Sequence, residues 1–311
     1  MHIKILGTAA DGGFPNWNCS CSNCSRLREG ALRGKSRTQT QIAFAPTSDV
    51  WFLVGASPDL RAQILATPEL SASSDSPGHS KIAGVFLPNA EVATVAGLLH
   101  LRELQNYFIF ATPAVQRIVR NENRIFRVLD CADPPVQWQS LSGRRRIGCH
   151  LSENPGDAPT FFYTAIPLGG DYPKYASENV SRDRPGEEAS IALLLEQANK
   201  KLFLAPSISG RHSEWIKIAA SADLALLDGT FWSDDELIAT GRTNKAAREL
   251  GHLPLSGPEG LLAQYPRDAG GRKMLVQLNH TNPILDESSD EHRALVEAGF
   301  EIAYDGMEIE L

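Results

Sequence analysis

The 311-residue chain has no apolar run approaching the roughly 20 residues that a membrane-spanning helix requires. Its opening segment, MHIKILGTAADGG, has too short an apolar stretch and too many glycines for a secretion signal. Aromatic residues make up only 7% of the chain, and no lysine-rich stripe accompanies the formal charge of -7. These absences predict a cytoplasmic protein that acts neither in a membrane nor on nucleic acid.

Cysteine is also scarce, with five in all, an odd number. Cys19, Cys21 and Cys24 lie too close together to pair comfortably with one another, so no disulfide framework is expected. The C-x-C-x2-C spacing instead lets three thiolates converge on one tetrahedral ion, for which zinc is the natural occupant. The alternative is three reduced cysteines in a turn. Spacing alone does not choose the fourth ligand among the eight histidines, Cys131 and Cys149.

Short apolar segments typical of strands alternate with helix candidates along the chain. The predicted strands are 2–7, 41–46, 50–54, 82–87, 107–111, 145–150, 160–165, 190–195, 201–205, 223–227 and 274–279. Turns rather than helices join many neighbours, which favours a layered α/β sandwich over a purely parallel sheet. We expect one domain over 1–311, with a mobile loop at 169–189 because that segment is polar and lacks periodicity.

Capping residues indicate where helices begin. The candidate N-caps are Ser57 and Thr112, each followed by proline, and Ser233 and Ser288, each followed three residues later by glutamate. Gly299 is expected to end the helix that Ser288 begins, because glycine readily adopts the left-handed conformation after a helix.

Eight segments, in order along the chain, together resemble the coenzyme pyrroloquinoline quinone (PQQ) biosynthesis protein B family, PqqB, of the metallo-β-lactamase superfamily. They are GTAADGGFPNWNCSCSNC at 7–24, RTQTQIA at 37–43, ASPDLR at 56–61, GLLHLRE at 97–103, DGTFWSDDE at 228–236, GH at 251–252, NHTNPILDE at 279–287 and DGMEIEL at 305–311. The resemblance implies an αββα sandwich, two mixed β-sheets flanked by helices.

The resemblance also implies ligand positions. Related phosphodiesterases of the superfamily complete a zinc site with a histidine that falls on His280 here, so Cys19, Cys21, Cys24 and His280 are the predicted structural zinc ligands. Alignment on Gly97-Leu98-Leu99 places Ala93 and Thr94 where the family has its catalytic Asp-His pair, and a later family histidine falls on Gln277. Alanine offers no donor, and a neutral threonine hydroxyl is a poor replacement for imidazole. A largely degenerate catalytic metal centre is therefore predicted.

Six polar residues are expected to line the remaining pocket. Asp228 and His252 are the candidate catalytic acid and base, and the candidate substrate-binding residues are Asp59, Asn89, Glu91 and Gln277. For Asp228 the alternative is a turn residue before Gly229, and for His252 it is a loop residue bound to the backbone.

Three functions follow from this reading. The resemblance implies iron-dependent hydroxylation of a tyrosine-derived or peptide-derived precursor in PQQ synthesis, but the usual two-histidine, one-carboxylate iron set is not displayed. An ordinary two-metal hydrolase is disfavoured because Ala205-Pro206 stands where many relatives carry a bridging aspartate. The alternatives are a non-catalytic binding, carrier or partner protein and a metal-independent enzyme of another small-molecule pathway. Expected partners are the precursor and a second copy or a pathway protein.

Overall fold

The computed structural model describes residues 1–72, 78, 80–103, 107–131, 133, 135–151, 157–177, 186–210 and 212–311. Within these ranges the strands form two mixed sheets of seven strands each. The chain divides into two compact units, the first formed by Met1–Leu6, Gln41–Lys201 and Gly306–Leu311, the second by Gly7–Thr40 and Leu202–Asp305. Each unit is thus assembled from segments that are far apart in the sequence. Across the described ranges no helix is both long enough and apolar enough to cross a membrane.

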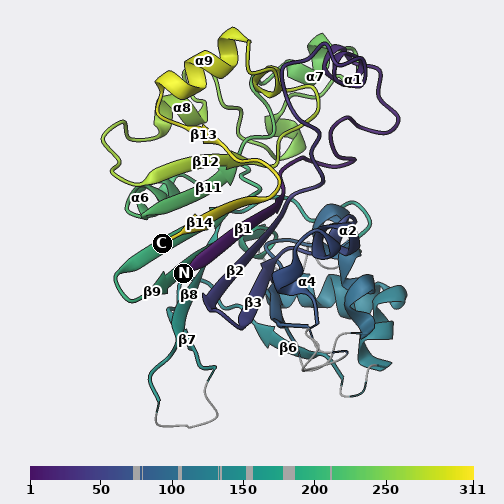
Figure 1. Ribbon diagram of the computed structural model, residues 1–311, viewed down its shortest axis with the longest axis vertical. Helices are drawn as coiled ribbons and strands as arrows, with labels where there is room; N and C mark the ends of the chain where they lie inside the picture. Colours follow the sequence, from purple (N-terminus) through teal and green to yellow (C-terminus); the bar gives the residue numbers. More distant parts are fainter. Residues whose placement is uncertain are drawn as a thin grey trace. The chain divides into compact units, whose positions relative to one another are not determined.

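The first unit contains a complete sheet in the strand order β14-β1-β2-β3-β4-β5-β6 (Figure 1). Its strands are β1 (His2–Gly7), β2 (Gln41–Thr47), β3 (Val50–Val54), β4 (Ile82–Phe86), β5 (Phe108–Ala111), β6 (Gln137–Ser140) and β14 (Met307–Glu310). β1 pairs antiparallel with β14, and β2 with β3, whereas β3 to β6 run parallel. The same unit holds the antiparallel strands β7 (Ile147–Cys149), β8 (Phe161–Pro167) and β9 (Ile191–Gln197).

Aromatic side chains fill the space between these two groups of strands. Phe44 and Phe52 stack with ring centroids 5.3 Å apart, and Phe161 of β8 meets both rings edge-on at 5.6 and 5.2 Å. Phe86 and Phe110 stack at 4.3 Å. Large buried rings in offset or edge-to-face contact contribute strongly to core stability, and here they join two sheet layers within one unit.

Among the described residues of the first unit, short α-helices are α2 (Leu60–Leu65), α3 (Val92–Val95) and α4 (Pro113–Gln116). Thr112 caps α4 as predicted, because its hydroxyl accepts from the N–H of Val115 and Pro113 occupies the first turn. The Ser57 prediction is wrong. Asp59 occupies the N-cap position of α2, and the hydroxyl of Ser57 donates instead to the side chain of Gln63 at 2.7 Å.

The second unit contains four parallel strands, β10 (Lys200–Ala205), β11 (Leu224–Asp228), β12 (Arg272–Val276) and β13 (Glu301–Ile302), with β10 beginning two residues before the unit does. Its helices are α1 (Ser22–Arg28), α6 (Glu214–Ala220), α7 (Glu236–Ala239), α8 (Leu261–Gln264) and α9 (Asp290–Glu297). Trp215 anchors α6 by stacking on Phe203 of β10 at 6.2 Å. Burial of the all-apolar centres of β10 to β12 holds these strands together.

Two predicted caps in this unit are one or two residues from the true ones. Ser289, not Ser288, caps α9 by accepting from the N–H of His292, because the hydroxyl of Ser288 bonds the carboxylate of Asp286. Asp235, not Ser233, occupies the N-cap position of α7. Gly299 follows α9 with a φ of 78°, as expected for the residue after a helix. Of the loop predicted at 169–189, residues 178–185 lie outside the described part of the chain.

Candidate functional site

The cysteine motif lies in the loop that leads into α1. Cys21 has extended backbone at the N-cap position, and Cys24 is fully buried in the first helical turn. Asn23 fixes this loop against a segment far away in the sequence, since its side-chain N–H₂ donates to the carbonyls of His280 at 3.2 Å and Asn282 at 3.0 Å. The motif and His280 are therefore held next to each other by hydrogen bonds that involve none of the proposed ligand atoms.

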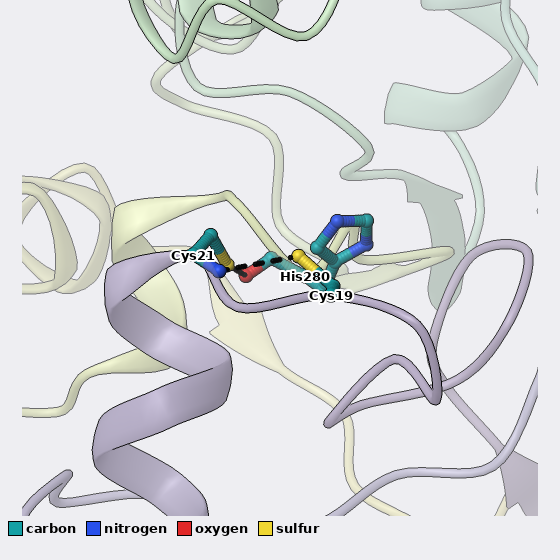
Figure 2. Close-up of side chains that lie close together, drawn as sticks. All are labelled: Cys19, Cys21 and His280. Atoms are coloured by element: carbon teal, nitrogen blue, oxygen red, sulfur yellow. Dashed lines mark hydrogen bonds between the residues drawn. The ribbon is translucent and has the colours of Figure 1, made fainter.

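Figure 2 shows the side chains of Cys19, Cys21 and His280 gathered at one point. One ligand atom from each lies within 4.8 Å of the other two. Cys24 is outside this group of three, but Cys19 and Cys21 both raise the pKa of its thiol, so it lies within electrostatic reach of them. The structure thus brings His280 close to Cys19 and Cys21, which lie more than 250 positions away in the sequence.

His280 has the properties of a metal ligand. Its Nδ1 and Nε2 are both buried and have no hydrogen-bond partner among the described residues. Buried polar atoms are rarely left unpaired, because each one costs a few kcal/mol. Burial, and then the charge of Arg242, lower the pKa of His280 to about 4. The ring is therefore neutral at pH 7, the state in which imidazole offers a lone pair to a metal.

The thiols also suit a cation. Burial raises the pKa of Cys19, but hydrogen bonds from Cys21 and the charge of Arg242 outweigh it, so the pKa lies below its usual value. The N–H of Cys21 lies 3.3 Å, and Nη1 of Arg242 3.0 Å, from the Cys19 sulfur. Burial, with Cys19 and Cys21 close by, raises the pKa of Cys24 to about 12. A bound cation would relieve this repulsion between sulfurs, so the residues present fit a zinc ion.

Asp228 and His252 form a second arrangement in the same unit. Asp228 ends β11 with only 1% of its surface exposed, and its Oδ2 lies 2.8 Å from Nδ1 of His252. The carboxylate also accepts from the N–H of Ile208 at 2.8 Å and from the N–H and hydroxyl of Thr230 at 2.9 and 2.6 Å. Because an ionised carboxylate only accepts hydrogen bonds, Nδ1 of His252 carries the proton. The structure thus brings the two predicted catalytic residues into direct contact.

The surroundings of this pair restrict its geometry. Phe231 meets the ring of His252 edge-on, with centroids 5.5 Å apart. Gly229 is required after Asp228, because a Cβ there would lie 2.8 Å from Leu278 and 2.9 Å from Leu275. Partial enclosure raises the pKa of Asp11, although its side chain reaches solvent, and the charge of His252 lowers it somewhat. A second carboxyl therefore lies within electrostatic reach of the imidazole.

Three of the predicted pocket residues belong to the first unit. Asp59 occupies the N-cap of α2, and Glu91 precedes α3. Asn89 is buried, and its side-chain oxygen accepts from the N–H of Glu91 at 3.0 Å. The hydroxyl of Tyr175 donates to the carbonyl of Ala90, and burial with the charge of Glu91 raises the pKa of Tyr175 to about 12. A cavity shared by these residues and those of the second unit stays a prediction.

The residues at the positions implied for the family's catalytic ligands differ in local structure. Ala93 and Thr94 lie within the short helix α3, where the carbonyl of Thr94 accepts from the N–H of Ala56 at 2.7 Å. Gln277 follows β12 with a φ of 62°, the left-handed region that non-glycine residues rarely adopt. Such strained backbone is concentrated at functional positions, although the side-chain amide of Gln277 is a weak metal ligand.

Comparison with known proteins places this geometry in a family. Residues 50–276 match the model of the beta-lactamase superfamily domain. The coenzyme PQQ synthesis protein B of Klebsiella pneumoniae (strain 342) is 36% identical over 313 residues, covering 100% of this chain and 98% of the relative. The protein of the same name from Azotobacter vinelandii is 37% identical over 311 residues, with both chains fully covered. The chain belongs to the coenzyme PQQ synthesis protein B family.

A solved structure supports the fold of this PqqB-family chain at full length. The crystal structure of Zn(2+)-bound PqqB from Methylobacterium extorquens matches with a TM-score of 0.88 and 34% identity, and all of both chains is covered. The expected metallo-β-lactamase fold, with two mixed sheets flanked by helices, is confirmed. The metal bound in that relative is zinc, the same metal that the cysteine spacing predicts for this chain.

Sequence reasoning on this PqqB-family chain missed several residues that shape the two arrangements. Asp11 was visible only as part of the first matching segment, and Asn23 as a residue between two cysteines. Arg242 lies in no motif, so only the fold reveals its contact with Cys19. Glu236 is predicted as a capping residue, and its carboxylate does accept from the N–H of Trp232 at 2.7 Å, but the sequence does not reveal that burial raises its pKa to about 7.

Proposed function

We propose that this chain acts in the synthesis of PQQ on a small-molecule or peptide-derived precursor. The single observation that carries the proposal is the likeness to proteins named coenzyme PQQ synthesis protein B, which extends over the whole chain. A match to the superfamily domain alone would not support a role in PQQ synthesis, because proteins that share a fold can differ in function. Here the first loop, the end of β12 and the C-terminal segment all belong to the region of similarity.

Zinc held by Cys19, Cys21, Cys24 and His280 is proposed to be structural. Four protein ligands close a tetrahedral site and leave no position for a substrate or an activated water. The ion would join the loop before α1 to the segment after β12, both in the second unit. When bound it contributes folding free energy rather than chemistry. This role is supported by the buried, unpartnered nitrogens of His280.

The chemical step is proposed to use Asp228 and His252. Asp228 holds the Nδ1–H of His252, so the other ring nitrogen, Nε2, is the one that takes up or releases a proton. Four accepted hydrogen bonds keep the carboxylate of Asp228 fixed. A histidine oriented by a buried aspartate acts as a general base near neutral pH. Removal of a proton from a phenol, an amine or an activated C–H of a precursor requires such a base.

A non-catalytic binding or carrier role is the second candidate. Ala93, Thr94 and Gln277 stand at the positions implied for catalytic metal ligands, and none of them provides a carboxylate or an imidazole. Family-type hydroxylation needs a redox metal with open positions, which the usual protein sites hold with two histidines and a carboxylate. The residues present at these positions do not fit that group, so no step is assigned to iron.

Complementation of a bacterial strain that lacks its PqqB protein tests the proposal. The natural chain is expected to restore PQQ, measured by mass spectrometry of culture extracts. His252→Asn, which removes the ring but keeps a small polar side chain, should lower PQQ at least about a hundredfold if it is the general base. His100→Asn changes an exposed histidine in the first unit and should leave PQQ unchanged.

Failure of the natural chain to restore PQQ, when it is expressed in folded form at the level of the deleted protein, would contradict the role in PQQ synthesis. Full PQQ production by His252→Asn would instead retain that role and remove the acid–base assignment. A carrier function predicts this second result, so the two candidate functions are distinguished in one assay.

A further inference from the structure

Asn282 lies in the segment after β12, two residues beyond His280, and its side chain is completely buried, with 0% exposed. Its side-chain oxygen accepts from the N–H of Ile284 at 3.1 Å and so caps the short 3₁₀ helix Pro283–Leu285. Serine or aspartate would cap a helix about as well as asparagine. Capping therefore does not explain why this buried position carries an amide N–H₂.

The amide N–H₂ of Asn282 donates to the turn directly after Asp228. Its nitrogen lies 2.9 Å from the carbonyl oxygen of Gly229 and 3.3 Å from that of Thr230. The backbone N–H of Asn279 also donates to the carbonyl of Thr230, at 3.2 Å. The segment after β12 thus supplies donors to both carbonyls of this turn, which is as deeply buried as the carboxylate before it.

One peptide group, between Gly229 and Thr230, connects Asn282 with the carboxylate of Asp228. Its carbonyl accepts from Asn282, and its N–H donates to Oδ1 of Asp228 at 2.9 Å. The C=O and N–H of a trans peptide lie in one plane and point in opposite directions, so a donor that fixes the carbonyl also fixes the direction of the N–H. Hydrogen bonds in such a chain polarise and strengthen one another.

The two oxygens of Asp228 have different partners. Thr230 occupies Oδ1 with its N–H and, at 2.6 Å, with its hydroxyl. Oδ2 accepts from the N–H of Ile208 and from Nδ1 of His252, both at 2.8 Å. Because the carboxylate is planar, its orientation at Oδ1 determines where Oδ2 meets the imidazole. The hydrogen bond at Nδ1 in turn sets which ring nitrogen carries the proton.

We propose that Asn282 is a positioning residue for Asp228 and His252, an inference that rests on the proposed function of this pair. It fixes the peptide after Asp228, and through that peptide it fixes the carboxylate that keeps the proton of His252 on Nδ1. Nε2 is then the nitrogen that takes up a proton from the precursor. The carbonyl of Asn282 accepts from the side chain of Asn23 at 3.0 Å, so the cysteine loop holds this positioning residue in place.

Nitrogen NMR of the zinc-loaded, full-length protein tests the proposal, because the ¹⁵N shifts of His252 report which ring nitrogen carries the proton. His252→Asn identifies the signals. Asn282→Ser keeps a cap acceptor but removes the amide donors. At pH 8.5 the ratio of the Nδ1–H to the Nε2–H tautomer is expected to fall at least about threefold in this variant. Ser289→Ala removes the N-cap of α9 in the same unit and should leave the ratio unchanged.

A second variant, Asn282→Thr, covers the case in which Asn282→Ser does not fold. Threonine also caps helices, and its volume is nearly that of asparagine, so the variant leaves little empty space and should show the same shift in tautomer ratio. Zinc content and a cooperative thermal transition identify the folded variants. An unchanged ratio in a folded variant of Asn282, or an equal shift in Ser289→Ala, would overturn the positioning role.

Complementation separates this proposal from the function on which it rests. In the strain that lacks its PqqB protein, Asn282→Ser should lower PQQ at least about tenfold, because the general base is misplaced. Full PQQ production by His252→Asn would remove the acid–base assignment alone. The tautomer ratio is measured without turnover, so a shift in Asn282→Ser would then still support the positioning of His252 by Asn282, and the absence of a shift would overturn it.

Discussion

At the scale of single residues, His280 is the ligand whose removal tests the zinc site most directly. It would supply the one nitrogen among three sulfurs, and its buried ring nitrogens have no other partner in the described chain. His280→Ala is expected to lose one zinc per chain and to lower the unfolding midpoint by about 5 °C or more, because metal binding is folding free energy. Elemental mass spectrometry and thermal unfolding measure the two effects.

The matched control for this variant is Cys131→Ser. Cys131 is an exposed free thiol in the first unit, so its loss should change neither zinc content nor the unfolding midpoint. Full retention of zinc by His280→Ala would remove this residue from the site and leave only the cysteines as candidates.

The residues of this site differ in how far the sequence could reveal them. The three cysteines are visible because their spacing is local, and local spacing determines which side chains can converge. His280 was available only through a resemblance, since no local pattern connects it with the cysteines. Arg242 and Asn23 act through contacts that exist only after folding, and therefore neither could be predicted.

At the scale of elements, the start of α7 depends on a buried carboxyl. Burial raises the pKa of Glu236 to about 7, although the N–H of Trp232 and the hydroxyl of Thr281 donate to it. The native state therefore holds this proton more tightly than the unfolded chain, whose pKa is near 4.5. The resulting stability is fully present below pH 4.5 and is lost as the pH rises through about 7.

Glu236→Gln should remove this pH dependence, because glutamine resembles the protonated carboxyl. With zinc saturating, the variant and the natural protein should have similar free energies of unfolding at pH 5. At pH 8 the variant should be more stable by about 2 to 3 kcal/mol, measured by urea unfolding. Glu259→Gln changes an exposed carboxylate and serves as the control. Parallel pH profiles for Glu236→Gln and the natural protein would show that Glu236 is ionised throughout.

Elements were predicted best where the signal is a run of apolar residues. All eleven strand predictions overlap strands of the structure, whereas β6, β13 and β14 were missed. β6 is mostly exposed and β13 has two residues, so neither presents an apolar run.

Cap positions were less certain because adjacent serines compete. Ser288 and Ser289 fit the pattern almost equally, and the bond from Ser288 to Asp286 leaves Ser289 to cap α9.

At the scale of the whole molecule, the chain crosses between its two units four times, near residues 6, 41, 201 and 306. Nothing in composition marks these crossings, since no linker-like segment lies at any of them. The predicted zinc ligands nevertheless all belong to the second unit, two of whose segments, Gly7–Thr40 and Leu202–Asp305, they would join. A metal ion that joins these segments closes a very long loop. In theory, the loss of conformational entropy that such a link imposes on the unfolded chain is largest for long loops.

Zinc removal should therefore affect one unit selectively. After treatment with a chelator, amide hydrogen exchange is expected to rise in 16–24 and 279–282, because the thiols would repel one another and the nitrogens of His280 would stay unpaired. Strands β2 to β5, whose core lies within the first unit, should keep their protection. His280→Ala should show the raised exchange before chelator is added and no further change afterwards. An equal rise in both units, or no rise in the cysteine loop, would contradict a structural ion confined to the second unit.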